Sequence, residues 1–391
     1  MHEMRMRKAT SVLVGLLLAG VAATPAHAKT IREQQWHLDA MKADDIWKVS
    51  TGKGVTVAVI DSGVAKIPEL DGRLVPGRDF APDSIAGDEH TDYDSHGTSM
   101  ASIIAGNGKG PGGVESAFGL APDAKIMPLR VNLKGNGFSN DTSLVEAIRH
   151  AADSEAKVLN LSIIGWRDSE SLREAVKYAV SKNKLIFAGV GNDGDTAVQY
   201  PAGIPGVVGV GAVGPDGVAT KESVRNASVD MSAPGVDIIS ACTGKSGLCN
   251  SHGTSDATAL SSASAALLWS AHPEWTNNQV LRVLLNTAGK PTDGVQRNDY
   301  IGYGVVRPKV ALPAPGDPGP ADVFPLPDLA AADAKNSPAP STTAKAPESA
   351  APQAEAKSDS VSGTTWIALG LGACVLVGGA VTAVVVRRRN G

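Results

Sequence analysis

Short apolar runs rich in β-branched residues alternate with segments of helical periodicity along residues 29–312. Such runs are typical of strands buried on both faces. Six are predicted as strands: 55–60, 125–131, 158–163, 185–190, 207–213 and 236–241. One helix is predicted to begin at His96, and another to begin after a cap at Ser139–Asp141. Three more helices are predicted over 171–181, 254–271 and 277–288. The alternation predicts an α/β fold, with a parallel sheet flanked by helices on both faces.

Composition narrows the classes of protein. Of the 391 residues, 42% are apolar and 19% are charged, which is enough to form a core. The formal net charge is −4, and no basic stripe occurs outside the chain ends, so we expect no nucleic-acid partner.

The two ends predict export and anchoring. Basic residues, an apolar stretch and the small-x-small sequence Ala26-His27-Ala28 indicate a signal peptide over residues 1–28, with an uncleaved anchor as the alternative. Residues 364–386 are predicted to cross the membrane, because no charge occurs from Trp366 to Val386. The basic tail 387–391 should stay in the cytoplasm, which gives a single-pass type I protein whose folded body is extracellular.

The segment between body and span is rich in small residues. Of its 51 residues, 313–363, 10 are Pro and 13 are Ala. Large apolar side chains are therefore too few for this segment to form a core. We interpret it as a disordered linker and place the folded body at residues 29–312. Within that body, Cys242 and Cys249 face an oxidising compartment, so we expect a disulfide, with two free thiols as the alternative.

Polar residues placed at strand ends and helix starts predict the chemistry. Ligands of parallel sheets bind beyond the carboxyl ends of the strands. Asp61 follows the first strand, and His96 and Ser255 stand where helices begin. Each alone has an ordinary explanation, as a cap or a loop residue. Together they suit a nucleophile, Ser255, whose proton passes to His96 while Asp61 orients the imidazole.

Asn192 follows the strand 185–190 within Gly191-Asn192-Asp193-Gly194. It could be an ordinary turn residue. Beside the other three groups it is predicted to donate to a developing oxyanion, together with the backbone N–H of Ser255.

The motifs Asp61-Ser62-Gly63, His96-Gly97-Thr98, Gly191-Asn192 and Gly253-Thr254-Ser255, in this order, resemble the subtilisin-like serine proteases. The resemblance covers residues 29–312. It implies a three-layer fold and hydrolysis of peptide bonds through an acyl-enzyme. It also implies substrate-binding roles for four positions: Ser162, Ile163, Gly165 and Gly189.

A narrower resemblance is to the mycosins, membrane-tethered subtilisin-like proteases associated with type VII secretion. It rests on residues 35–39 (QWHLD) and 43–47 (ADDIW), on the linker, on the single span and on the basic tail. It implies a protein or peptide substrate and a secretion membrane complex as partner.

Three positions depart from the family pattern. Asp256 follows the serine, and Ala259 stands where the family usually has proline. Asp256 is explained by the helix dipole, or it stabilises a charged His96 and raises its pKa. Ile164 stands where a glycine is usual, so it is expected to crowd the specificity pocket and favour small side chains, unless Gly165 takes that place.

The sequence nominates no cofactor and no metal. His90, Asp92 and Asp94 are a loose acidic cluster that we interpret as solvated. The three departures leave a second function open, a protease fold kept as a weakly active or inactive scaffold of a secretion complex. An esterase with the same triad has no separate support.

Overall fold

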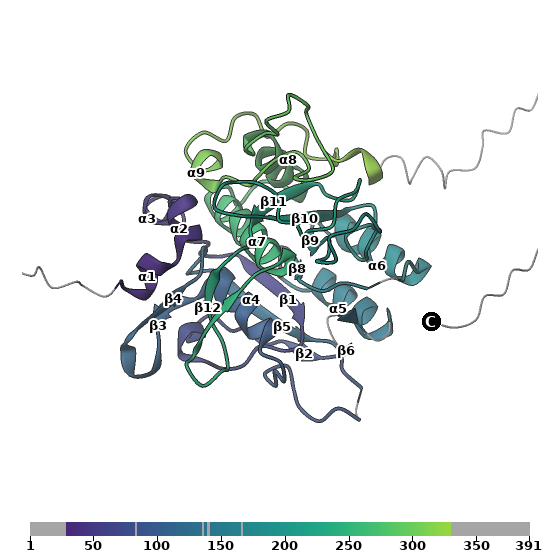
Figure 1. Ribbon diagram of the computed structural model, residues 1–391. Helices are drawn as coiled ribbons and strands as arrows, with labels where there is room; N and C mark the ends of the chain where they lie inside the picture. The colour runs from purple at the N-terminus through teal and green to yellow at the C-terminus, as the bar shows by residue number, and fades with distance from the viewer. Residues whose placement is uncertain (1–28, 83, 135–136, 139–140, 166, 330–391) are drawn as a thin grey trace, which may run out of the picture. The chain divides into compact units, whose positions relative to one another are not determined.

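A seven-stranded sheet forms the centre of the molecule (Figure 1). The computed structural model describes residues 29–329 except 83, 135–136, 139–140 and 166. The strand order is β11-β10-β9-β8-β1-β5-β2, and every neighbouring pair is parallel. The strands are β1 (Thr56–Asp61), β2 (Arg78–Asp79), β5 (Lys125–Arg130), β8 (Val158–Leu161), β9 (Leu185–Gly189), β10 (Val207–Val213) and β11 (Met231–Pro234).

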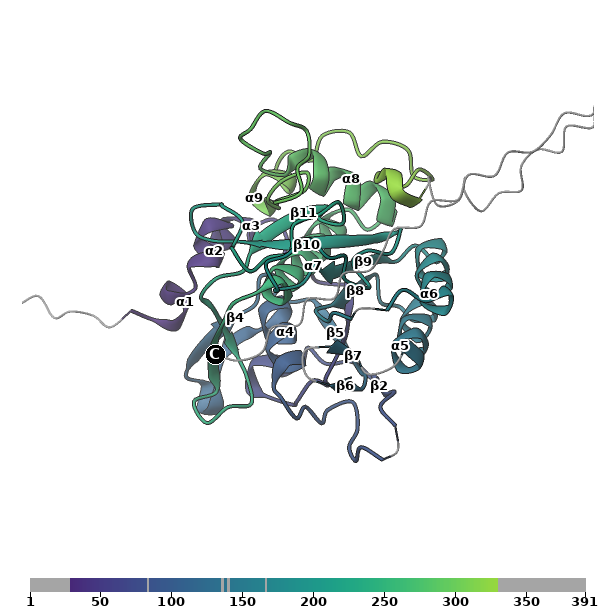
Figure 2. The same ribbon diagram turned by 45° about the vertical axis from the view of Figure 1, so that its right-hand side comes forward.

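Helices cover both faces of the sheet, as predicted. Side chains of β1 alternate between two cores, Val57 and Val59 in one and Ala58 and Ile60 in the other. The first core includes α4 (His96–Ala105), α7 (Thr254–Ala271) and α8 (Asn277–Thr287). The second is covered by α5 (Asp141–Asp153) and α6 (Glu170–Ser181), which lie side by side (Figure 2). The residues predicted to cap α5 lie partly outside the described part of the chain.

Helix α7 is enclosed by protein along nearly its whole length. Ala, Ser and Leu dominate its sequence, and these side chains allow close packing against β8, β9, β10 and α4. Its buried hydroxyls need partners, and Thr258, Ser261 and Ser264 each donate to the carbonyl four residues earlier. The helix that begins beside Ser255 is therefore fixed in place by the core.

The predicted strand at 236–241 does not join the main sheet. Residues 238–241 form β12 (Ile238–Ala241), which pairs antiparallel with β13 (Leu248–Ser251). The edge strands of the main sheet are instead the short β2 and β11, which the pattern analysis missed. Two further small sheets are β3 (Asn107–Lys109) with β4 (Glu115–Phe118), and β6 (Leu133–Lys134) with β7 (Gly137–Phe138).

The start of the described chain is fastened to the body by polar side chains. It forms α1 (Ile31–Gln34), α2 (Trp36–Ala40) and α3 (Ala43–Ile46). Between them, buried Gln35 exchanges hydrogen bonds with the backbone of Phe118 and donates to the carbonyl of Ile239. The indole of Trp36 donates to the carbonyl of Val236 at 2.8 Å. This segment thereby joins two small sheets that are distant in sequence.

Packing continues beyond residue 312, where the sequence analysis ended the folded body. After α9 (Pro308–Ala311), the chain runs along α8, and Leu326 is buried. The guanidinium of Arg282 donates to the carbonyls of Pro318, Pro320 and Val323. These contacts compensate for the low apolar content of residues 313–329, which is why composition alone did not reveal them.

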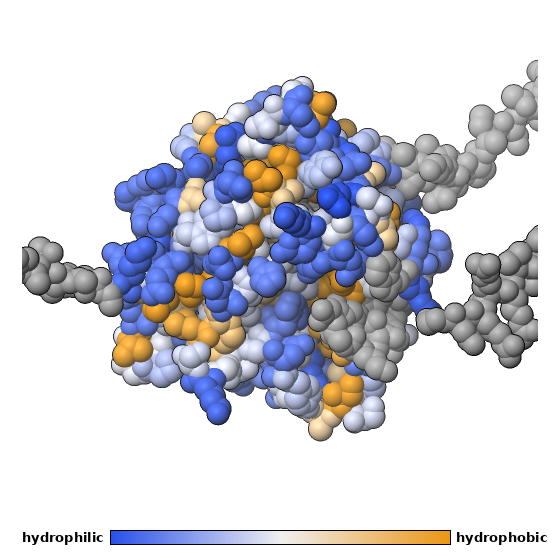
Figure 3. Space-filling model, in the orientation of Figure 1, coloured by the Kyte–Doolittle hydropathy of each residue, from blue (hydrophilic) through white to orange (hydrophobic). Residues whose placement is uncertain are grey.

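Among the described residues, no helix combines the length and hydropathy needed to cross a bilayer. The predicted signal peptide, the predicted span and most of the predicted linker lie outside the described residues. The face shown in Figure 3 is mainly hydrophilic, with scattered apolar residues, as on most folded domains.

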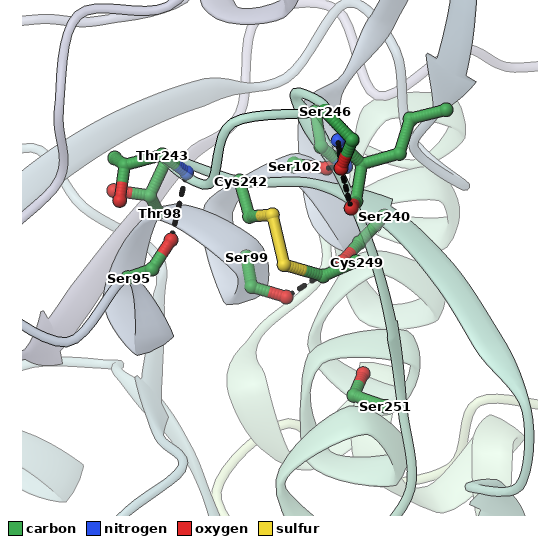
Figure 4. The surroundings of a disulfide bond; sticks show 12 residues. Ser95, Thr98, Ser99, Ser102, Ser240, Cys242, Thr243, Ser246, Cys249 and Ser251 are labelled. Atoms are coloured by element: carbon green, nitrogen blue, oxygen red, sulfur yellow. Dashed lines mark hydrogen bonds between the residues drawn. A yellow bond between two sulfur atoms is a disulfide. The ribbon is translucent and has the colours of Figure 1, made fainter.

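A disulfide joins Cys242 to Cys249 and closes the β12–β13 hairpin (Figure 4). Hydroxyls of α4 and the residue before it hold this hairpin. The Oγ atoms of Ser95 and Ser102 accept from the backbone N–H groups of Thr243 and Ala241 at 2.7 Å, and Ser99 shares a hydrogen bond with Ser240. Because β13 leads into α7, the hairpin connects the start of α4 with the start of α7.

His37 is fully buried, and neither ring nitrogen has a hydrogen-bond partner among the described residues. Burial, and secondarily the charge of Arg32, lowers the pKa of His37 from 6.5 to about 3. The folded protein therefore keeps this imidazole neutral at acidic pH, where the unfolded chain would protonate it.

Replacing both cysteines, Cys242→Ser with Cys249→Ser, is expected to lower the free energy of unfolding. A cross-link closing so short a loop restricts the unfolded chain by roughly 2–3 kcal/mol. Urea denaturation of the double variant measures the loss. Wild-type protein in reductant is the control and should match the variant; equal stability of oxidised wild type and variant would contradict the expectation.

His37→Leu is expected to make stability less sensitive to acid. For wild type, the contribution of His37 is fully present above pH 6.5 and is lost as pH falls from 6.5 toward 3, because only the unfolded chain takes up the proton. Melting temperatures measured from pH 7 to 4 should fall less in the variant. Exposed Gln34→Leu, which removes no titrating group, is the control and should keep the wild-type slope; an unaltered slope in His37→Leu would refute the account.

Candidate functional site

Asp61 and His96 form a pair at the carboxyl edge of the sheet. Asp61 is the last residue of β1, and its side chain is fully buried. Its Oδ1 lies 2.8 Å from Nδ1 of His96 and accepts the backbone N–H of Ser62 at 2.8 Å. The imidazole, the first residue of α4, is about one third exposed. The carboxylate of the pair therefore lies in the core, whereas the imidazole is partly open to solvent.

Asp92 fixes the start of α4 and with it His96. The first N–H groups of a helix have no intrahelical partner. Asp92 accepts from the N–H groups of Ser95 and Thr98 and from the hydroxyls of Thr98 and Ser62. Burial raises the pKa of Asp92, against the effect of these donors. The sequence analysis placed Asp92 in a solvated cluster. Its position three residues before Ser95 and six before Thr98 was the sequence signal for this capping role.

The surroundings of His96 favour its charged form. Burial alone would lower its pKa, but the charge of Asp61 and its hydrogen bond, then the charges of Asp94 and Asp256, outweigh this. The pKa of His96 rises from 6.5 to about 9. The site is thus built to stabilise an imidazolium.

Ser255 lies in the first turn of α7, half-buried. Its hydroxyl donates to the carbonyl of Ser162 at 3.2 Å, and the hydroxyl of Ser162 donates back to the carbonyl of Ser255 at 2.9 Å. Fully buried Asn160 on β8 supports this contact, since it donates to Ser162 and accepts from Ser262 of α7. Helix α7 is consequently fastened to the end of β8. Sequence reasoning missed Asn160, whose only signal was a polar residue within an apolar strand.

Asn192 lies just beyond β9, exposed beside the start of α7. Its Oδ1 accepts the N–H of Thr254 at 2.9 Å. The structure thus places the Asn192 amide against Thr254, the residue before Ser255.

The four predicted substrate-binding residues lie on two segments beside Ser255. Ser162 and buried Ile163 follow β8, and Gly165 exchanges two backbone hydrogen bonds of 2.8 Å with Tyr200. Gly189 ends β9, and a Cβ there would lie 2.9 Å from the hydroxyl of Thr254. Ile164 is partly buried.

Asp256 is almost fully buried, although it follows the half-exposed Ser255. Its Oδ1 accepts the hydroxyl of Ser251 at 2.6 Å. Burial raises the pKa of Asp256 from 3.8 to about 6, opposed by the Ser251 bond and by the charge of His96. Both explanations of Asp256 agree with the structure. The residue lies in the first turn of α7, and its negative charge favours the charged form of His96. Ala259 is buried within the same helix.

The described residues contain no group of three side chains suited to hold a metal ion. Asp92 already accepts hydrogen bonds from the N–H groups at the start of α4. Nδ1 of His90 lies 3.1 Å from the carbonyl oxygen of Val64. Chemically, the arrangement offers a hydroxyl at a helix start, a carboxylate-bound imidazole and an amide donor, a set suited to acyl transfer.

Asp256→Asn and Asp94→Asn are each expected to lower the pKa of His96, because each removes a negative charge that stabilises the imidazolium. NMR titration of the imidazole measures both shifts. Asp94 is exposed and Asp256 is buried, so salt should weaken the Asp94 effect and spare that of Asp256. An unchanged or raised pKa in Asp256→Asn would contradict the assignment.

Comparisons with known proteins identify the family of this chain. Residues 52–304 match the model of the subtilase family. Mycosin-1 of Mycobacterium tuberculosis is 32% identical over 343 residues, covering 73% of this chain and 74% of the relative. Subtilisin Savinase of Lederbergia lenta is 34% identical over 239 residues, covering 61% and 84%.

Solved structures give the same result. The crystal structure of MycP1 from Mycobacterium smegmatis superposes with a TM-score of 0.65 at 29% identity, covering 76% of this chain and 89% of that one. A chain of the periplasmic assembly from the ESX-5 inner membrane complex has a TM-score of 0.65 at 28% identity, covering 77% and 89%. The fold, the matched residues and the mycosin and subtilisin relatives together show that this chain belongs to the subtilase family of serine proteases.

Proposed function

We propose that this chain is a membrane-anchored extracellular endopeptidase whose triad is Ser255, His96 and Asp61. The observation that carries the proposal is the buried carboxylate–imidazole pair at the sheet edge where α7 presents Ser255. In this mechanism, Ser255 turns from the carbonyl of Ser162 and attacks the substrate carbonyl carbon. Neutral His96 takes the hydroxyl proton, and Asp61 stabilises the imidazolium that forms.

Stabilisation of the oxyanion is assigned to Asn192. Attack places negative charge on the former carbonyl oxygen, and donors aimed at that oxygen lower the barrier. The Nδ2 group of Asn192 and the N–H of Ser255 at the start of α7 are the proposed donors. The imidazolium then protonates the leaving amine, the peptide bond breaks, and water hydrolyses the acyl-enzyme by the same steps in reverse.

The setting of this activity follows from the predicted chain ends and from the relatives. A signal peptide over 1–28 and a span over 364–386 would hold the protease domain outside the membrane. Mycosin relatives and the match to a chain of the ESX-5 assembly support a type VII secretion complex as partner. The substrate is a protein or peptide.

The second candidate is a scaffold with the same fold and little catalysis. The hydrogen bond from Ser255 to the carbonyl of Ser162 favours it, since the hydroxyl is directed away from its proposed base in the resting structure. The two functions differ in whether Ser255 can be activated.

A fluorophosphonate probe applied to the full chain in membranes separates the two candidates. Wild type is expected to be labelled, because His96 and Asp61 activate the hydroxyl, and Ser255→Ala is expected to lose labelling completely. Ser270→Ala, at the far end of α7, is the matched control and should retain it. A folded wild type that resists the probe would reject the triad and favour the scaffold.

A further inference from the structure

Ser95, the residue directly before His96, has a backbone conformation that serine rarely adopts. Its φ is +73° and its ψ is 0°, in the left-handed region. For a residue with a Cβ this conformation costs free energy, and it persists only where surrounding contacts impose it. Because Ser95 is the N-cap of α4, its backbone angles set the direction in which His96 enters the helix.

The hydroxyl of Ser95 does not cap its own helix. A serine at this position usually accepts an N–H of the first helical turn. Here the carboxylate of Asp92 accepts the N–H of Thr98 instead. The Oγ of Ser95 accepts the backbone N–H of Thr243 at 2.7 Å (Figure 4). The serine that precedes His96 therefore binds a segment far away in the sequence.

That segment is the hairpin closed by the disulfide. Thr243 directly follows Cys242, whose bond to Cys249 closes the loop. The hydrogen bond from Thr243 to Ser95 is exposed, so water can replace Ser95 as the partner of this N–H. Such an exchange changes the free energy of unfolding little. The contact therefore acts mainly on the position of the chain before His96.

The other end of the same hairpin contacts the residue after Ser255. Ser251, the last residue of β13, donates its hydroxyl to Oδ1 of Asp256 at 2.6 Å. One hairpin thus forms hydrogen bonds with the residue before His96 and with the residue after Ser255. Losing either hydrogen bond removes a restraint on the spacing of these two side chains.

We propose that Ser95 is a positioning residue for His96: its hydrogen bond to the hairpin fixes the left-handed turn that holds the imidazole against Asp61. This proposal rests on the proposed protease activity. Without the hydrogen bond, the backbone of Ser95 can leave the strained conformation, and His96 moves with it. A displacement of about 1 Å in a catalytic group can slow a reaction about 10²-fold.

Ser95→Ala removes the hydroxyl and still disfavours the left-handed turn. We expect the fluorophosphonate probe to label this variant about tenfold more slowly than wild type, or slower still. The rates are compared for the full chain in membranes, on the alkaline plateau of the pH profile. Ser95→Gly also lacks the hydroxyl but adopts the turn freely, so it should be slowed less. Wild-type rates in both variants would overturn the proposal.

Ser102→Ala is the matched control. The Oγ of Ser102 also accepts an N–H of the hairpin at 2.7 Å, from Ala241, but two turns further along α4. This bond is buried, so its loss leaves an N–H without a partner and should lower the urea midpoint more than Ser95→Gly does. The labelling rate should nevertheless stay that of wild type. Equal slowing in Ser102→Ala and Ser95→Ala would show a merely structural role and refute the proposal.

The pKa of His96 reports its position without any catalysis. Burial lowers this pKa, but the charge and hydrogen bond of Asp61 outweigh burial and, with the charges of Asp94 and Asp256, raise it to about 9. In Ser95→Ala the contact with Asp61 should loosen, so the pKa should fall toward 6.5. NMR titration of the full chain in detergent micelles measures it. An unchanged pKa in Ser95→Ala would reject the positioning role.

The two readouts separate the failure of this proposal from that of the proposed function. Labelled wild type, with an unaltered rate and pKa in Ser95→Ala, means that the triad is active and that Ser95 does not position His96. Folded wild type that resists the probe rejects the proposed activity. A lowered pKa in Ser95→Ala would then still support the positioning of His96 by Ser95.

Discussion

The burial of the Asp61 carboxylate is the constraint on which the rest of the site depends. A charge removed from water is tolerated only when it is paired and hydrogen-bonded. Ser62 and His96 provide these contacts, and each must then be held in place. Asp92 does so by fixing the start of α4 and by accepting the hydroxyl of Ser62. The buried carboxylate is thus linked to the start of α4 directly by His96 and indirectly by Ser62 and Asp92.

The second requirement is that distant segments meet beside this charge. Parallel strands bring the ends of β1, β8 and β9 to one edge, and the enclosed helix α7 presents Ser255 there. Asn160, Ser162 and Ser262 link β8 to α7 through buried hydrogen bonds. The hairpin closed by the disulfide links α4 to α7 through Ser95, Ser99 and Ser102. Because a core of this kind has few alternative packings, the relative positions of α4 and α7 are strongly restrained.

What the sequence predicted, and what it missed, follows from the range of the interactions. Long buried runs predicted β10 and α7 at their observed bounds, because periodicity and burial agree there. Strand β12 was assigned to the wrong sheet, since an apolar run does not specify its pairing partner. Residues 313–329 looked unable to fold because their stabilising contacts come from Arg282 and other side chains of the body. Asn160 and Asp92 each left a local signal, a polar residue within an apolar strand and a carboxylate just before a helix, but their partners are brought together only by folding, so the signal did not reveal the role.

In the proposed mechanism, the negative charges around His96 act on catalysis in two opposing ways. By raising the pKa of His96 to about 9, they leave only about a tenth of the molecules with a neutral base at pH 8. The same charges stabilise the imidazolium that forms when Ser255 gives up its proton, so they lower the energy of the transition state. The share that Asp256 contributes persists only while Asp256 is ionised, and burial raises the pKa of this carboxyl to about 6. Catalysis by this arrangement should therefore improve from neutral toward alkaline pH, where Asp256 remains charged and a growing fraction of His96 is neutral.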